Sequence, residues 1–272
     1  MDHKKYITEK GTIHYWVNIC TPGKKWIVFL PGLTADHSLF DSQVDCFSKK
    51  YNTFVWDAPA HGLSRPFELS FSMQDIVHYL YTIFQIEHIV MPIFVGQSLG
   101  GYIAQVYITE YPNTTLGFIS VDSCPMSRRY YSWWELALMR HTKGMYMCVP
   151  WKLLLKWGIN GTSETSYGRQ VMKNAWSVYT KEEYCSLADY GYRILVEAIT
   201  ARETYSITCP VLLLCGERDH AGSAKRYNRN WAKFEGYKLC WITDAGHNSN
   251  TDSPEQVNNL IELFVGELSS EI

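Results

Sequence analysis

The most informative part of this chain reads Ile93-Phe94-Val95-Gly96-Gln97-Ser98-Leu99-Gly100-Gly101. Its first residues end an apolar run, Ile89–Val95, that predicts a buried strand, and its last residues open a predicted helix. Gly96, Ser98 and Gly100 form the pattern G-x-S-x-G at this junction. A serine in a tight strand-to-helix turn, with small residues two positions away on either side, is typical of a nucleophile elbow. We therefore expect Ser98 to be a nucleophile, with helix N–H groups pointing at the reacting atoms.

Buried strands and helices alternate on both sides of this turn. Trp26–Leu30 is a continuous apolar run ended by Pro31-Gly32, which suits a strand covered on both faces. Further strands are predicted at Thr53–Trp56, Leu116–Val121, Val211–Cys215 and Lys238–Ile242, after an N-terminal hairpin of His3–Thr8 and Thr12–Cys20. Helices are predicted at Ser38–Lys49, Ser72–Phe84, Leu99–Tyr111 and Ala224–Phe234. This alternation predicts an α/β fold, with a mostly parallel sheet and helices on both faces.

The last helix has a clear start in the sequence. Ser253 suits its N-cap and Pro254 its first residue, and Gln256 is placed to complete a capping box with Ser253. The apolar residues that follow recur at helical spacing and predict one buried stripe.

Residues 123–205 interrupt the alternation, because they contain no convincing strand. Helices are predicted there at Ser132–Arg140, Trp151–Trp157, Ser166–Tyr179 and Lys181–Thr200. So long a helical stretch between two strands predicts a cap, or lid, inserted into a core domain made of residues 1–122 and 206–272. The predicted cap holds five of the ten tryptophans and five of the eight methionines. These side chains suggest an apolar pocket, although packing between cap helices accounts for most of them.

Composition and charge exclude several classes of protein. The 272 residues are 46% hydrophobic, 15% aromatic and 19% charged, which excludes a disordered chain, a collagen and a coiled coil. A net charge of −2 gives no sign of nucleic-acid binding. The predicted cap has 11 Lys/Arg against 7 Asp/Glu, which either favours an anionic substrate or is solvated surface charge.

The chain is expected to be cytoplasmic and without a membrane span. No apolar run approaches the roughly 20 residues that cross a bilayer, and no signal-peptide core follows the first residues. The eight cysteines are scattered, with no C-x-x-C and no Cys/His cluster, so we expect reduced thiols and no metal site.

A serine hydroxyl needs a base to remove its proton, and the chain offers nine histidines. His247 follows the last predicted strand and precedes the final helix, which places it at the carboxyl edge of the sheet, where sites of open α/β folds lie. His220 is its main rival, directly beside Asp219. His61 is more typical of a residue that braces a loop.

The base in turn needs a carboxylate that orients it and stabilises its charged form. Asp219 follows the predicted strand Val211–Cys215 and lies between Ser98 and His247 in the chain, so we favour it. Asp122, just after another predicted strand, is the alternative. The expected triad is therefore Ser98, Asp219 and His247.

An oxyanion hole is the remaining requirement, because negative charge develops on the carbonyl oxygen under attack. The backbone N–H of Leu99, at the helix start, suits one donor. We expect the other donor to be the backbone N–H of Leu33, in the loop after Trp26–Leu30, since Gly32 lets the chain approach closely there.

Five motifs, in this order along nearly the whole chain, resemble those of the α/β-hydrolase fold superfamily with a helical cap. They are Leu30-Pro31-Gly32-Leu33, Asp57-x-Pro59-x-His61-Gly62-x-Ser64, Gly96-x-Ser98-x-Gly100-Gly101, Gly216-Glu217-Arg218-Asp219 and Gly246-His247. The resemblance implies an eight-stranded sheet, a Ser–His–Asp triad, a cap inserted after the sixth strand and no cofactor. The chain departs from many relatives by carrying Pro31-Gly32 where they carry His-Gly, which puts any role for that histidine in doubt.

The resemblance implies a capped serine hydrolase, esterase-like, that cleaves a small ester or related acyl compound with an apolar portion. Ser98 argues against haloalkane dehalogenases and epoxide hydrolases, which resemble this family but use an aspartate nucleophile. A carbon–carbon bond hydrolase or lyase on the same scaffold is an alternative, as is a small-molecule sensor that retains the triad.

Overall fold

The computed structural model describes residues 1–201 and 205–268. Its strands are β1 (Asp2–Thr8), β2 (Gly11–Asn18), β3 (Trp26–Leu30), β4 (Asn52–Asp57), β5 (Ile93–Gln97), β6 (Gly117–Val121), β7 (Val211–Gly216) and β8 (Lys238–Ile242). They form one eight-stranded sheet in the order β1-β2-β4-β3-β5-β6-β7-β8. Strand β2 runs antiparallel to both of its neighbours, and the other neighbours pair in parallel. The predicted fold class, a mostly parallel eight-stranded sheet flanked by helices, is confirmed.

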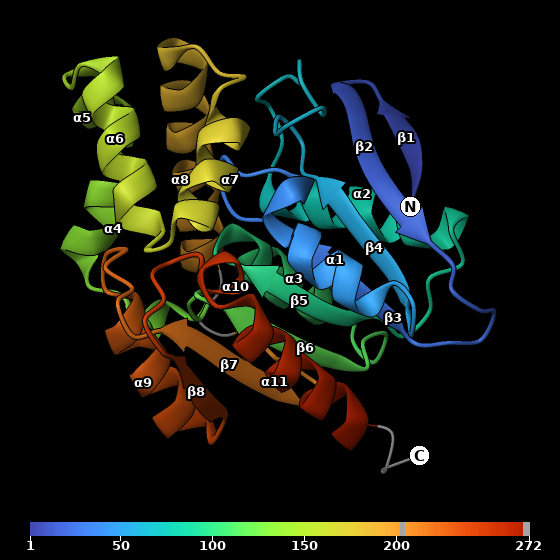
Figure 1. Ribbon diagram of the computed structural model, residues 1–272. Helices are drawn as coiled ribbons and strands as arrows, with labels where there is room; N and C mark the ends of the chain where they lie inside the picture. Colours follow the sequence, from blue (N-terminus) through green and yellow to red (C-terminus); the bar gives the residue numbers. More distant parts are fainter. Residues whose placement is uncertain (202–204, 269–272) are drawn as a thin grey trace.

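Helices cover both faces of this sheet. They are η1 (His37–Phe40, a 3-10 helix), α1 (Asp41–Phe47), α2 (Met73–Ile86), α3 (Leu99–Glu110), α9 (Ala224–Glu235), α10 (Ser249–Asp252) and α11 (Pro254–Glu267). Figure 1 shows α1 and α11 in front of the sheet and α2 and α3 behind it. Because both faces are covered, every residue of β3, β5 and β6 is buried, which explains their continuous apolar runs.

The chain between β6 and β7 is helical. It forms η2 (Arg128–Tyr130), α4 (Trp133–Met139), α5 (Thr142–Met147), α6 (Trp151–Thr162), α7 (Ser166–Trp176) and α8 (Lys181–Ala201). Helices α4 and α5 pack against α8, and α6 packs against α7. Figure 1 shows these helices beside the carboxyl ends of the central strands. The described residues of this region contain no strand, and α5 is a helix that the sequence reading did not identify.

Two local expectations were wrong. The strand predicted over Ile89–Val95 begins only at Ile93, because His88 and Met91 adopt positive φ and the chain turns there. Ser253 and Pro254 do begin α11, but the predicted capping box does not form. The amide of Gln256 instead bonds the end of β8, accepting from the Thr243 N–H at 3.1 Å and donating to the Trp241 carbonyl at 3.3 Å.

Within residues 1–201 and 205–268, every helix falls short of the length and apolar content that crossing a membrane requires.

Candidate active site

The turn between β5 and α3 holds Ser98 in a strained backbone conformation, with φ 48° and ψ −114°. The chain is so tightly folded here that a Cβ on Gly96 would lie 2.5 Å from the Gly101 nitrogen. A Cβ on Gly100 would lie only 1.8 Å from the Leu30 carbonyl oxygen. Both glycines of the G-x-S-x-G pattern are therefore required by close backbone approach, as expected for a nucleophile elbow.

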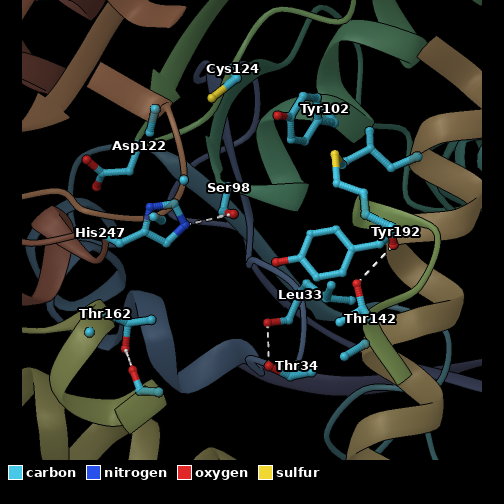
Figure 2. A pocket seen from close by; sticks show the side chains of 18 of the residues that line it. Leu33, Thr34, Ser98, Tyr102, Asp122, Cys124, Thr142, Thr162, Tyr192 and His247 are labelled. Carbon is cyan, nitrogen blue, oxygen red and sulfur yellow. Dashed lines mark hydrogen bonds between the residues drawn. The ribbon is translucent and has the colours of Figure 1, made fainter. Parts of the chain in front are cut away.

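The structure brings Ser98, His247 and Asp219 into one hydrogen-bonded chain. Nε2 of His247 lies 3.0 Å from Oγ of Ser98, and Nδ1 lies 3.0 Å from Oδ2 of Asp219. An ionised carboxylate only accepts, so Nδ1 carries a proton, and in the neutral ring Nε2 is left to accept from the serine hydroxyl. The Asp219 side chain is completely buried, and its second oxygen accepts from the Ala221 N–H at 2.8 Å. Figure 2 shows the imidazole turned toward Ser98 at the wall of a cavity.

A second buried carboxylate, Asp122, lies beside this chain. Its oxygens accept from the N–H groups of Gly216 at 2.7 Å and Ser249 at 2.9 Å, so it joins the end of β7 to the start of α10. Burial and the nearby charge of Asp219 raise the pKa of Asp122 well above the usual range of a carboxyl group. Asp122, the alternative acid of the sequence reading, thus braces the loops that carry Asp219 and His247.

These charges control the basicity of His247. Burial alone lowers its pKa, because a charged imidazolium is poorly solvated inside the protein. The charge of Asp219 and its hydrogen bond to the ring, with the charge of Asp122, outweigh burial and raise the pKa of His247 to about 9. The site is therefore built to stabilise the imidazolium that forms when the histidine takes a proton.

One group of described residues, Asp122, Cys215 and Asp219, brings possible metal ligands within 4.8 Å of one another. Both oxygens of Asp122 already accept backbone hydrogen bonds, and Asp219 is bound to His247 and the Ala221 N–H. Burial also raises the pKa of the Cys215 thiol, which opposes the thiolate form that a metal needs. The donor set is thus engaged in the hydrogen bonds of the protein itself.

The two other histidines that the sequence singled out lie apart from this chain. His220 is exposed, although the neighbouring Asp219 is buried. His61 is buried, and its Nδ1 lies 2.9 Å from the carbonyl oxygen of Pro59. This contact fits the expectation that His61 braces its loop.

Leu33 and Leu99, the predicted oxyanion donors, both lie next to Ser98 in the fold. Leu99 is the first residue of α3, and Leu33 lines the cavity that Ser98 faces. A Cβ on Gly32 would lie 2.2 Å from Oε1 of Gln97 and 3.2 Å from Cβ of Ser98, so the loop needs glycine to approach this closely. Among the described residues, neither leucine N–H donates a backbone hydrogen bond, which leaves both N–H groups available to a ligand.

Three residues that the sequence reading missed hold the His247 loop in place. The side-chain amide of Gln97 donates to the His247 carbonyl at 2.8 Å and to Oδ1 of Asn248 at 3.0 Å. The N–H of Asn248 in turn donates to the carbonyl of Thr162 at 2.8 Å, at the end of α6.

Asp252 is the third. One of its oxygens accepts from the N–H groups of Gly246 at 2.9 Å and Glu164 at 2.8 Å. The other accepts from the N–H and the hydroxyl of Thr165, at 3.0 and 2.9 Å. Asp252 therefore ties the His247 loop to the junction of α6 and α7. No local motif marks these residues, because their partners lie up to 151 residues away in the chain.

Ser98 and His247 face a cavity of about 550 Å³ between the carboxyl edge of the sheet and helices α4–α8. Its aromatic lining includes Tyr102, Tyr131, Tyr146, Tyr184, Tyr192 and Tyr227. Figure 2 shows Tyr102 and Tyr192 among the side chains around the same space as Ser98. Of the five tryptophans in residues 123–205, Trp134 and Trp176 line this cavity. The cavity has the size and the apolar character of small-molecule sites.

The described residues that line this cavity include two carboxylates and one group that can carry a positive charge, the imidazole of His247. The two carboxylates are those of Asp122 and Glu135, and none of the described lining residues is Lys or Arg. Burial opposes ionisation of Glu135, but hydrogen bonds from Ser132 and Tyr227, among others, lower its pKa to about 2. Arg226, outside the lining, is ion-paired with the same carboxylate.

Comparison with known proteins gives consistent results. Residues 25–254 match the model of the α/β-hydrolase fold family. The chain is 21% identical over 254 residues to 3-oxoadipate enol-lactonase 2 of Acinetobacter baylyi, covering 88% of both chains. A hydrolase from Pseudomonas aeruginosa has a similar structure, with a TM-score of 0.78 and 14% identity over 97% of this chain and 98% of that one. A thermophilic esterase from Thermogutta terrifontis also has a similar structure, with a TM-score of 0.72 and 17% identity over 98% of this chain and 99% of the esterase chain.

Proposed function

This chain belongs to the α/β-hydrolase family, and we propose that it is a serine hydrolase that cleaves an uncharged carboxylic ester or lactone. The observation that carries this proposal is the hydrogen-bonded chain Ser98–His247–Asp219 at the wall of an apolar cavity. The names of the similar proteins, an enol-lactonase and an esterase, support hydrolysis of an ester bond.

The first half of the proposed reaction forms an acyl-enzyme. Oγ of Ser98 attacks the carbonyl carbon while Nε2 of His247 takes the hydroxyl proton, over the 3.0 Å that separates the two atoms. Asp219 holds the ring by its Nδ1–H and stabilises the imidazolium. The N–H groups of Leu33 and Leu99 donate to the oxygen of the tetrahedral intermediate. The intermediate collapses as His247 returns the proton to the departing alkoxide.

The second half repeats these steps with water. His247 takes a proton from the water that attacks the acyl carbon, and returns it to Oγ of Ser98 as the acid leaves. In a lactone the acyl and alcohol parts are joined, so the ring-opened hydroxy acid is the single product. Every proton in both halves passes through Nε2 of His247.

We further propose that residues 123–205 act as a cap over a core domain of residues 1–122 and 206–272. Tyr146, Tyr184 and Tyr192 from α5 and α8 contribute to the cavity wall, so a substrate must lie between these helices and Ser98. Because such a cap excludes water from the site, it strengthens the electrostatic interactions of the triad.

The charge of the cavity argues for an uncharged acyl group. A carboxylate on the substrate would be placed near Asp122 and Glu135, with no Lys or Arg in the described lining to pair with it, and His247 in the same lining must be uncharged to act as the base. Burying an unpaired charge costs several kcal/mol. The positive net charge of residues 123–205 therefore does not extend to the cavity, and we propose a neutral substrate with an apolar acyl chain or ring.

A matched pair of esters tests both parts of this proposal. We expect turnover of p-nitrophenyl pentanoate, and we expect kcat/KM for the p-nitrophenyl monoester of glutaric acid, which adds one carboxylate, to be lower by about 100-fold or more. Ser98→Ala and His247→Ala are expected to abolish turnover of the neutral ester, while His220→Ala keeps it. Equal rates for the two esters would contradict the substrate class, and activity retained in Ser98→Ala would contradict the mechanism.

A further inference from the structure

Helices α4, α5 and α6 expose an unusual number of large apolar side chains. They are Trp133, Trp134, Leu138, Met145, Met147 and Trp157, and we call these six residues the apolar patch. Trp133 is 76% exposed and Trp157 is 57% exposed. Tryptophan is mostly buried in folded proteins, so two such exposed rings in one helical region require an explanation. Figure 1 shows α4, α5 and α6 together along one edge of the molecule.

Half of the residues of the patch also line the cavity. Trp134, Leu138 and Met145 are exposed to solvent and also line the cavity that Ser98 faces. Trp134 and Leu138 are one helical turn apart and share a face of α4, whereas Glu135 and Leu136 are turned inward and buried. The helix thus presents apolar side chains that are both exposed to solvent and part of the cavity wall.

Positive charge accompanies the patch. Residues 133–157 contain four Lys or Arg and a single carboxylate, in a chain with a net charge of −2. Arg140, Lys152 and Lys156 are exposed. The single carboxylate, Glu135, is buried and paired with Arg226. Three exposed cations therefore lie on or at the end of helices that carry the patch, and the described residues 133–157 contain no exposed carboxylate.

We propose that the apolar patch docks on an anionic lipid surface, with the mouth of the cavity facing the lipid. Tryptophan rings favour the boundary between headgroups and acyl chains, and lysine and arginine pair with anionic headgroups. A substrate with an apolar acyl part then passes from the lipid into the cavity along Trp134, Leu138 and Met145. The docking proposal is inferred from the apolar patch and the exposed Lys and Arg residues of the same helices. Only the delivery of substrate from the lipid rests on the proposed function.

Charge distinguishes lipid from a second copy of this chain as the occupant. A symmetric dimer places the same patch of both copies face to face. The exposed cations Arg140, Lys152 and Lys156 of both copies would then be brought close together, and like charges in an interface are repulsive. An anionic surface offers the complementary charge.

Vesicle sedimentation of the full chain, without substrate, tests the proposal. The chain is expected to bind vesicles of phosphatidylcholine with 30% phosphatidylglycerol at low salt, and to bind pure phosphatidylcholine much more weakly. Lys152→Gln with Lys156→Gln is expected to lower the partition coefficient by roughly 25-fold, since each cation near an anionic surface contributes roughly fivefold. Trp133→Ser with Trp157→Ser is expected to lower it by roughly tenfold or more through lost apolar contact. Leu263→Ser, at an exposed leucine of α11, is the matched control and is expected to bind as the parent does.

Turnover of a short water-soluble ester shows that the variants are folded, because neither Trp133 nor Trp157 lines the cavity. Vesicle binding that is equal for the two lipid compositions, or unchanged in both double variants, would overturn the proposal. The proposal would also be overturned if the parent chain is a dimer in sedimentation equilibrium and the double variant Trp133→Ser, Trp157→Ser is a monomer, because the patch would then be a subunit interface. Repeating the vesicle-binding assay with Ser98→Ala separates docking from catalysis. If Ser98→Ala binds vesicles while the parent chain does not turn over esters, only the proposed function is overturned.

Discussion

Replacing Asp252 with alanine removes a carboxylate that accepts four hydrogen bonds, from Gly246, Glu164 and Thr165. A hydrogen bond to a charged group contributes about 1.5–3 kcal/mol, and a donor left without a partner carries a further penalty. Water replaces part of the carboxylate at this half-buried position, so we expect a loss of about 3–5 kcal/mol in the free energy of unfolding rather than the full sum. The same change frees the loop that positions His247, and we expect kcat to fall by roughly 10- to 100-fold.

Guanidinium unfolding and ester turnover measure the two effects separately. Asp189→Ala is the matched control, because Asp189 accepts from one backbone N–H, that of Lys143 at 2.8 Å. Its expected loss is about 1 kcal/mol, without an effect on kcat. If Asp252→Ala loses no more stability than Asp189→Ala, the inferred tie between the His247 loop and the α6–α7 junction is wrong. If stability falls while kcat is unchanged, Asp252 supports the helices without positioning His247.

Two further predictions concern the base and the turn at the nucleophile. In the pH profile of kcat/KM, activity is expected to fall as the pH drops through the raised pKa of His247, about 9, because the protonated ring cannot accept a proton. Asp122→Asn removes a charge that raises this pKa, so it is expected to move the acidic limb to lower pH by about one unit, and an unmoved limb would refute this role. Gly100→Ala is expected to lower the free energy of unfolding by about 3 kcal/mol or more, because its Cβ would lie 1.8 Å from the Leu30 carbonyl oxygen. Gly144→Ala, which meets nothing within 4 Å, is expected to stabilise the chain by about 0.5–1 kcal/mol, and thermal unfolding of the two variants checks both values.

The features that the sequence predicts well are those with a local physical cause. The strained turn at Ser98 depends on Gly96 and Gly100, which lie within two residues of it, so the pattern is visible in a single stretch. Asp219 follows the buried strand β7 and His247 follows β8, the last strand of the sheet, and parallel strands bring their carboxyl ends to one edge of the sheet. The sequence therefore indicates that these three side chains lie together, and in the structure they do.

Features that depend on contacts between distant segments were not predictable in this way. Gln97 and Asp252 bond to loops up to 151 residues away, and the partners of Asp252 depend on where the α6–α7 junction lies. The capping box at Ser253 failed for the same reason, since β8 provides competing partners for Gln256. Composition likewise shows that residues 123–205 are rich in tryptophan, but not which rings line the cavity and which form the apolar patch.

The central claim is that Ser98 is the nucleophile of an ester hydrolase, and intact-protein mass spectrometry after treatment with a fluorophosphonate tests it most directly. We predict a single adduct that peptide mapping assigns to Ser98, that is absent in Ser98→Ala, and that forms normally in Ser120→Ala. Ser120 is a matched control because it is a buried serine on the neighbouring strand β6. An adduct on another residue, or labelling that persists in Ser98→Ala, would contradict the claim.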